Sequence, residues 1–177
     1  MQNKDAGLER WLLAVVPKAV AYARSLTSRP DDAEDVVHDV ISRLLSHREY
    51  DLLANGDKLL FRSITNACIS RRRRAREMAS LDARHPETGD YLVEPPEASA
   101  ESDPVAAAMT GELAAAVQRE LAELPPLQRA AVELKALDRS LREIGEILDV
   151  TPSNAGVLVF RGRKLLAERL APYLQES

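Results

Sequence analysis

Residues 140–169 read SLREIGEILDVTPSNAGVLVFRGRKLLAER, and this stretch carries the local signals of two helices joined by a short turn. Ser140 and Glu143 have the S-x-x-E spacing of a capping box, in which a hydroxyl and a carboxylate each accept a backbone N–H at a helix start. After a three-residue turn, Thr151 can cap a second helix, and Pro152 suits its first position because the missing N–H costs nothing there. A short helix, a turn and a longer helix predict a helix-turn-helix, the unit that lays its second helix in a major groove.

Apolar residues recur at helical spacing along both predicted helices. They are Leu141, Ile144, Ile147 and Leu148 on the first helix, and Ala155, Val159, Gly162 and Leu166 on the second. A plain helical hairpin inside a core would show the same stripes. The closely spaced caps and the small Gly162 on the packing face favour the DNA-binding interpretation.

The composition favours a helical protein without disulfides. Of 177 residues, 45% are hydrophobic, 4% are aromatic and 7 are glycine, so the core must rest on Leu, Val, Ile and Ala. The single cysteine, Cys68, excludes a disulfide framework and fits a reducing compartment. No apolar run approaches the roughly 18 residues of a membrane span, and residues 1–10 lack a signal-peptide core. We therefore expect a cytoplasmic all-α protein with no membrane insertion.

Charge is distributed unevenly along the chain, although the net charge is only −4. Residues 1–76 carry a net charge of +4, residues 77–112 a net charge of −8, and residues 113–177 a net charge of zero. The averaged value therefore hides a basic first block, which suits nucleic acid.

The acidic middle also contains residues that disfavour regular structure. Several prolines lie there among Glu, Asp, Ser and Ala, with few large apolar side chains. We therefore expect two small helical domains, 1–76 and 108–177, joined by a flexible acidic linker over residues 77–107. The alternative is a long surface loop within one domain, but structureless loops of that length are uncommon in compact domains.

Three helices are predicted in the first domain. They span Leu8–Leu26, Asp32–Ser46 and Asp57–Arg76, with a capping turn at residues 28–32 and a break or kink at Pro17. The expected buried faces consist of Ala33, Val36, Val37, Val40, Ile41, Leu44 and Leu45 on the second helix, and Leu60, Ile64, Ala67 and Cys68 on the third.

The second of these helices has an acidic face opposite its buried stripe. This face carries Asp32, Glu34, Asp35, His38 and Asp39. The spacing i, i+3, i+4 within this set could suit a metal, yet a metal site needs further ligands, and the other two histidines lie in no motif. We interpret the face as a solvated or partner-binding surface and predict no metal site.

The third helix ends in a basic run of Arg71, Arg72, Arg73, Arg74 and Arg76. Such a run is usually a solvated tail. Here it suits the dipole at a helix C-terminus and lies in an otherwise acidic chain, so phosphate binding is the favoured interpretation. The sequence lacks a Gly-rich phosphate loop, G-x-S-x-G and H-E-x-x-H, and the cysteine falls on a predicted buried face. We therefore expect no catalytic residue and no cofactor.

Five motifs occur in an order that resembles one bacterial protein family. They are DAEDVVHDVISRLL at 32–45, RSITNACISRRRR at 62–74, ELPPLQR at 123–129, SLREIGEILDVT at 140–151 and RGRKLL at 161–166. Together they resemble the extracytoplasmic-function group, or group IV, of the sigma-70 family of RNA polymerase sigma factors, over most of the two predicted domains.

The resemblance implies a transcription initiation factor that binds core RNA polymerase through its β′ and β subunits and directs it to promoters under the control of an anti-sigma factor. It implies polymerase contacts from Asp32, Asp35, His38 and Asp39. It implies contacts with the −10 element from Asn66, Arg71, Arg72, Arg73, Arg74 and Arg76. It implies contacts with the −35 element from Arg142, Ser153, Asn154, Gly156, Val157, Phe160, Arg161, Arg163 and Lys164. The acidic linker would run towards the RNA exit channel, and we expect a monomer when the protein is free.

Several positions depart from the family's pattern. His38 stands where Gln is usual, Ser70 where Asp is frequent, and Asp149 where the turn usually has Gly. Gly156 and Phe160 stand where basic residues or His are frequent. Asp tolerates the left-handed conformation, so we expect the turn to form with Asp149.

The predicted reading face is less basic than is usual in this family. Asn154 can pair bidentately with adenine, and Val157 can pack on a thymine methyl, while the basic residues one to two turns later suit flanking phosphates. We therefore expect an A·T-containing −35 motif. In a competing interpretation, Val157, Leu158 and Phe160 form an apolar patch that a regulator binds.

Two other functions are compatible with parts of the sequence. A self-sufficient helix-turn-helix regulator would be a dimer and would bind DNA tightly without polymerase. A helical metal-dependent hydrolase built on Asp35, His38 and Asp39 would require further metal ligands, which the sequence does not supply.

Overall fold

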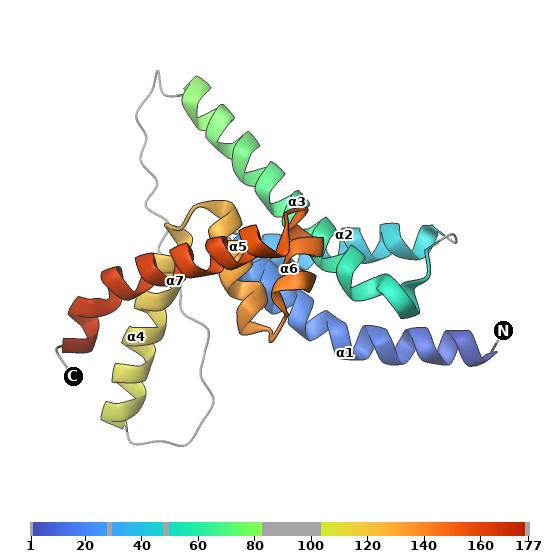
Figure 1. The fold of residues 1–177 in the computed structure, drawn as a ribbon, viewed down its shortest axis with the longest axis horizontal. Coiled ribbons are helices and arrows are strands. Elements are labelled where there is room, and N and C mark those ends of the chain that lie inside the picture. The colour runs from blue at the N-terminus through green and yellow to red at the C-terminus, as the bar shows by residue number, and fades with distance from the viewer. Residues whose placement is uncertain (1, 28–29, 48–49, 83–103, 176–177) are drawn as a thin grey trace.

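A computed structural model describes residues 2–27, 30–47, 50–82 and 104–175, and these residues form seven α-helices and no strand (Figure 1). The helices are α1 (Gln2–Leu26), α2 (Pro30–Ser46), α3 (Leu52–Asp82), α4 (Pro104–Ala122), α5 (Pro126–Ala136), α6 (Leu141–Leu148) and α7 (Pro152–Gln175). The predicted all-α fold is confirmed. None of the described helices is both long enough and apolar enough to cross a membrane.

The first three helices pack together as a bundle. Tyr22 of α1 lies at its centre, where its ring meets Phe61 edge-on at 5.2 Å between centroids and its hydroxyl shares a 2.7 Å hydrogen bond with Thr65. A buried Tyr hydroxyl needs such a partner. The predicted stripe of α2 is buried except at Ile41, which is half-buried, and Leu45, which is 41% exposed.

The first helix continues through Pro17, so the helix is not broken there, whereas the alternative prediction of a kink stays a prediction. Proline lacks the N–H that would bond to the carbonyl of Leu13, four residues earlier. The side chain of Leu13 is 72% exposed, which places this turn on the solvent side of α1. Water can bond to the carbonyl there, and the helix survives the loss of one internal hydrogen bond.

The third helix is longer than predicted at both ends. It begins at Leu52, because the Asp51 carboxylate accepts the backbone N–H of Ala54 at 3.3 Å and so caps the helix. Gly56 lies within this early part, where a Cβ would come within 2.5 Å of the Trp11 ring. The helix then runs to Asp82, six residues beyond the predicted end, into the segment predicted as linker.

The predicted helix-turn-helix is formed by α6 and α7, and its caps are confirmed. The Ser140 hydroxyl accepts the backbone N–H of Glu143 at 3.2 Å, and the Glu143 carboxylate accepts the backbone N–H of Ser140 at 2.9 Å. Asp149 ends α6 in the left-handed conformation with φ 59°, as predicted for Asp in place of Gly. The Thr151 hydroxyl accepts the backbone N–H of Asn154 at 3.2 Å and caps α7.

Most of the apolar stripe predicted for this unit is buried. The buried members are Ile144, Ile147, Leu148, Ala155, Val159 and Gly162, whereas Leu166 is half-buried and Leu141 is 40% exposed. Gly162 lets α7 approach α5 closely, since a Cβ there would lie 2.6 Å from a methyl group of Val132.

The two halves of the chain pack against each other, an arrangement that the sequence did not predict. Helix α3 contacts α6, and α1 contacts α5 and α4, so that α5 and α6 lie over the middle of the bundle (Figure 1). Buried residues of both halves form one hydrophobic cluster. The predicted domain limits at 76 and 108 fall inside α3 and α4, and residues 83–103 of the predicted linker lie outside the described residues. The linker therefore stays a prediction.

Gly145→Ala should destabilise the helix-turn-helix. A Cβ at this buried position of α6 would lie 2.7 Å from the backbone oxygen of Val150 in the turn, and overpacking typically costs about 1–3 kcal/mol. The matched control is Gly156→Ala, whose Cβ would meet Leu141 at 3.4 Å and whose alanine favours helix by up to about 1 kcal/mol. Urea unfolding should show a loss of stability for the first variant and none for the control. Equal stability of the two variants would contradict this role of Gly145.

Candidate nucleic-acid interface

One side of α7 is buried against the core, and the other side faces solvent. Of the residues predicted to read the −35 element, Gly156 is half-buried, and the rest are exposed: Arg142, Ser153, Asn154, Val157, Phe160, Arg161, Arg163 and Lys164. Phe160 is 68% exposed and Val157 41%, and Leu141 lies beside them next to Gly156. The structure thus brings the predicted reading residues together on one accessible surface, with an apolar strip between polar ends.

The basic run does not form one patch. Successive residues of an α-helix point about 100° apart, so consecutive arginines face different directions. Arg71 donates to the backbone oxygen of Asp32 at 3.5 Å, whereas Arg72 donates to the backbone oxygen of Ala122, at the end of α4, at 3.0 Å.

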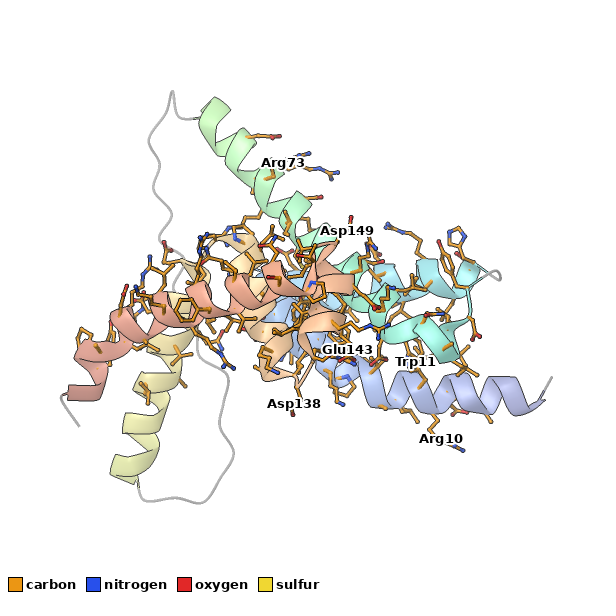
Figure 2. All side chains as sticks on the ribbon, viewed as in Figure 1. Arg10, Trp11, Arg73, Asp138, Glu143 and Asp149 are labelled. Atoms are coloured by element: carbon orange, nitrogen blue, oxygen red, sulfur yellow. The ribbon has the colours of Figure 1, made fainter. Side chains whose placement is uncertain are left out.

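Two further members of the run lie on the part of α3 that projects from the bundle. Figure 2 shows Arg73 on this projecting part. Arg73 and Arg74 are both exposed, and Arg73 lies 3.6 Å from the carboxylate of Glu77. Asn66 is exposed earlier on the same helix. Arg76 belongs to α3, but its side chain lies outside the described residues. Phosphates could therefore meet these residues from more than one side.

The acidic face of α2 is accessible. Asp35, His38 and Asp39 are exposed, and Asp32 is half-buried. Arg71 lies 3.9 Å from the carboxylate of Asp39, so the start of the basic run reaches this face. Among the described residues, no three His, Cys, Asp or Glu side chains gather in an arrangement that could hold a metal ion.

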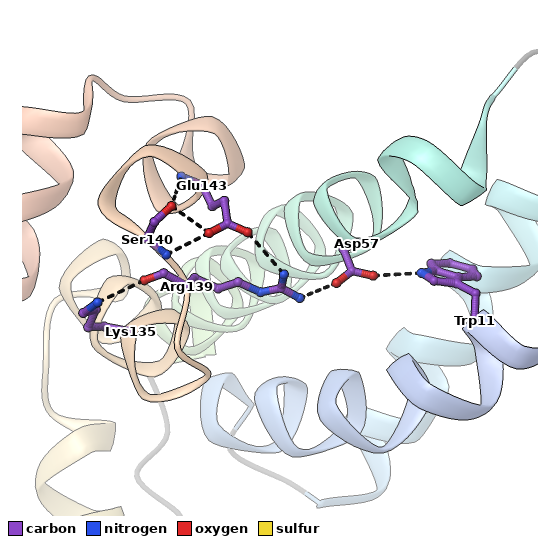
Figure 3. A network of polar contacts seen from close by, with 6 residues as sticks. All are labelled: Trp11, Asp57, Lys135, Arg139, Ser140 and Glu143. Carbon is purple, nitrogen blue, oxygen red and sulfur yellow. Dashed lines mark hydrogen bonds and ion pairs between the residues drawn. The ribbon is translucent and has the colours of Figure 1, made fainter.

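A polar network joins the helix-turn-helix to the bundle (Figure 3). Arg139, just before α6, pairs with Asp57 of α3, whose other carboxylate oxygen accepts the indole N–H of Trp11 at 2.8 Å. The same guanidinium lies over the ring of Phe61, 5.2 Å from its centroid, and 3.4 Å from Glu143. Sequence reasoning missed the pairing of Arg139 with Asp57, because these two residues are 82 residues apart and neither belongs to a motif.

Two more ion pairs extend this contact between α3 and α6. Lys58 lies 3.2 Å from Glu146, and Arg62 lies 3.1 Å from Asp149. The hydrogen bond from Lys58 is the main cause that lowers the pKa of Glu146. Together with Asp57–Arg139, these two pairs form what we call the polar seam. An open cleft of about 820 Å³ lies along the seam, and Asn154 of α7 lines it.

Behind the seam, α5 places one buried and one half-buried charged side chain against the bundle. Arg129 is 4% exposed, and burial, with Arg72 nearby, lowers its pKa to about 10. Burial raises the pKa of Glu133, which the neighbouring Arg129 partly offsets. Burial likewise raises the pKa of the Cys68 thiol to about 11, which makes the thiolate rare at neutral pH and fits the predicted core position.

Both halves of the chain are similar to known proteins. Two family models match the chain: Sigma-70 region 2 over residues 12–78 and Sigma-70, region 4 over residues 114–166. The ECF RNA polymerase sigma factor SigW of Bacillus subtilis (strain 168) is 28% identical over 141 residues, which cover 78% of this chain and 75% of that protein. The chain belongs to the extracytoplasmic-function group of the sigma-70 family. The first family model spans α1 to α3, and the second spans α4 to α7.

A solved structure shares the fold of this sigma factor. It is the sigma factor RpoE in its complex with the anti-sigma factor NepR from Bartonella quintana, with a TM-score of 0.68, 24% identity, and coverage of 93% of this chain and 96% of that one. The family's members are transcription initiation factors, not enzymes. This sigma factor accordingly binds core RNA polymerase and directs it to promoters, and the hydrolase and dimeric-regulator interpretations find no support.

Proposed function

We propose that this sigma factor reads the −35 element with the exposed side of α7 and docks on the polymerase β′ subunit with the acidic face of α2. The observation that carries the proposal is the division of α7 into two sides. Ala155 and Val159 hold the helix on the core, while Asn154, Val157 and Arg161 face solvent on the other side of the helix. A capped helix with its first turns exposed suits insertion into a major groove.

The chemistry of the reading side favours A·T base pairs. Asn154 can form two hydrogen bonds with an adenine edge, and Val157 with Phe160 can pack on thymine methyl groups. Gly156, half-buried beside Leu141, adds no side chain between the helix backbone and the bases. Arg161, Arg163 and Lys164 follow one to two turns later and suit the flanking phosphates, as does Arg142 from α6.

We assign the −10 element to the exposed part of α3. Asn66, Arg73 and Arg74 are accessible there, and Arg71 and Arg72 would join them where promoter DNA replaces their present contacts with α2 and α4. The first domain, the acidic linker and the second domain would then follow the promoter and the polymerase surface in chain order, with a further polymerase contact on the β subunit.

We also propose control by an anti-sigma factor. The solved structure that shares this fold contains the anti-sigma factor NepR, and the apolar strip on α7 offers a surface for such a partner. We propose that the free chain is a cytoplasmic monomer without catalytic, cofactor or metal site.

The most direct test of the whole proposal mixes the protein with core polymerase and genomic DNA and maps the transcript starts. These starts should share a −35 motif. Starts identical to those of core polymerase alone would refute the proposal.

Asp35→Ala combined with Asp39→Ala should weaken binding to core polymerase by about tenfold, or about 1.4 kcal/mol, and leave the melting temperature nearly unchanged. Both carboxylates are exposed, so their contribution to folding is small. The control is Glu9→Ala with Asp138→Asn, which removes two exposed acids away from α2. Titration of labelled protein with core polymerase measures both. Wild-type affinity in the α2 variant would exclude this face from docking.

Asn154→Ala should relax the preference at one −35 base pair by about 1–3 kcal/mol, because the bidentate pair with adenine is lost. Arg161→Ala should instead weaken all promoters alike and reduce the salt slope of binding by about one, as expected for a lost phosphate contact. Holoenzyme binding to a set of single-base promoter variants at several salt concentrations separates the two effects.

A different outcome would favour the competing interpretation, in which a regulator binds the apolar patch on α7. If Asn154→Ala keeps the wild-type promoter preference while Phe160→Ala escapes inhibition in cells, the apolar strip binds the regulator and our assignment of the reading side is wrong.

A further inference from the structure

Apolar side chains occupy the middle of the exposed side of α7. Phe160 is 68% exposed and Val157 41%, and their spacing of three residues makes them neighbours on the helix surface. Leu141 of α6, itself 40% exposed, lies against Gly156, which is one turn before Phe160. These four residues make up the apolar strip. Exposed apolar clusters of this kind mark partner sites.

The charges around the apolar strip favour a polyanion as its partner. Residues 152–164 contain three basic side chains and no acidic one, and all three are exposed: Arg161, Arg163 and Lys164. The next acid along the helix, Glu168, lies one turn beyond Lys164 and 3.9 Å from its ammonium group. The phosphates on either side of a major groove supply counterparts for such charges, whereas an apolar protein segment does not.

The major groove offers one apolar group to such a strip. Bases present nitrogen and oxygen atoms there, and thymine adds the methyl group on its C5 atom. An apolar side chain pressed against a guanine edge or a cytosine amine would leave that polar group without a hydrogen bond, which costs free energy. The modified base 5-methylcytosine carries a methyl group on the same ring atom as thymine. Both methylated pyrimidines therefore present the same apolar group in the groove.

We propose that the apolar strip reads the C5 methyl group itself, so that 5-methylcytosine replaces thymine in the −35 element and cytosine methylation raises promoter affinity. This inference rests on the reading role proposed above for α7 and extends it from thymine to a modified base. Val157 and Phe160 contact the methyl groups. Leu141 is a positioning residue, which closes the strip on the side of α6.

The apolar strip lacks the groups that would tell the two methylated pyrimidines apart. Beside its methyl group, thymine presents a carbonyl oxygen and 5-methylcytosine an amino group. Val157, Phe160 and Leu141 have no side-chain donor or acceptor for either group. Asn154 lies three residues before Val157, or about 4.5 Å earlier along the helix axis at 1.5 Å per residue. This exceeds the rise of about 3.4 Å between base pairs, so Asn154 reads a neighbouring pair.

The test changes single methyl groups on the DNA and uses holoenzyme. Promoter libraries randomised only in the −35 region are synthesised in three forms. This region contains the ordinary bases, uracil in place of thymine, or 5-methylcytosine in place of cytosine. Sequencing of the bound fraction gives the preference at each position. Wild-type holoenzyme should prefer thymine at one or two pairs beside the adenine read by Asn154. Uracil should bind about fourfold more weakly there, and 5-methylcytosine about fourfold more tightly than cytosine, as expected for one buried methyl group.

Protein variants assign these two methyl effects to the apolar strip. Val157→Ser with Phe160→Ser should abolish both effects, whereas Val157→Ile with Phe160→Leu should keep them because the side chains stay apolar. Leu141→Ala should reduce both to about twofold. The matched control, Leu127→Ala, removes a 41% exposed leucine from α5 and should keep the fourfold effects. Each effect is a ratio between two DNAs for one protein, so a general loss of affinity cancels. Circular dichroism monitors folding.

Two results would overturn the proposal. One is equal binding by the wild type of thymine and uracil, or of cytosine and 5-methylcytosine, at every position. The other is methyl effects of the same size in the serine variant and the wild type, because the methyl groups would then act without the strip. If the methyl effects are absent while the serine variant escapes inhibition in cells, a regulator is the occupant of the strip.

The same holoenzyme separates this inference from the proposed function. If Asn154→Ala and Arg161→Ala alter promoter binding as expected but the methyl effects are absent, the reading role of α7 stands and the methyl inference fails. If those two variants leave promoter binding unaltered, the reading role itself fails.

Discussion

The carboxylate of Asp57 joins parts of the chain that are far apart in sequence. It accepts the indole N–H of Trp11 and pairs with Arg139, which in turn lies over Phe61 and beside Glu143 (Figure 3). Asp57 is therefore the point at which the first bundle meets the start of α6 and the capping box of the helix-turn-helix. This contact sets the orientation of the helix-turn-helix on α3, and with it the cleft and the exposed side of α7.

The interface combines an apolar centre with polar contacts of uneven quality. Buried apolar residues of both halves supply the attraction, while exposed ion pairs at the edge add little to it and mainly fix the register. Each buried polar atom without a partner, such as Arg129 Nε, costs about 1–3 kcal/mol. Such a balance gives the chain a defined compact form in which the exposed contacts at the edge of the interface are weak.

The sequence predicted those structural features that depend only on a few neighbouring residues. The capping box at Ser140, the left-handed Asp149 and the buried stripe of α7 all follow from spacing and residue type within one or two turns. The pairing of Asp57 with Arg139 has no local signature, so the closed packing could not be predicted. Helical geometry also spreads residues that the sequence groups, which is why the basic run points in several directions. The helix does not break at Pro17, because the carbonyl group that loses its helical partner lies on an exposed turn, where water can bond to it.

We expect the two halves of this sigma factor to stay packed together when it is free and to separate when it engages polymerase and promoter. Double electron–electron resonance between spin labels on Ser42→Cys in α2 and Ala167→Cys in α7 measures the distance between the two halves directly. Both positions are exposed, whereas the native Cys68 is buried and its pKa is raised to about 11, so it should escape labelling. We expect a short, narrow distance distribution for the free chain and a much longer distance in the promoter-bound holoenzyme. The same distance in both states would contradict it.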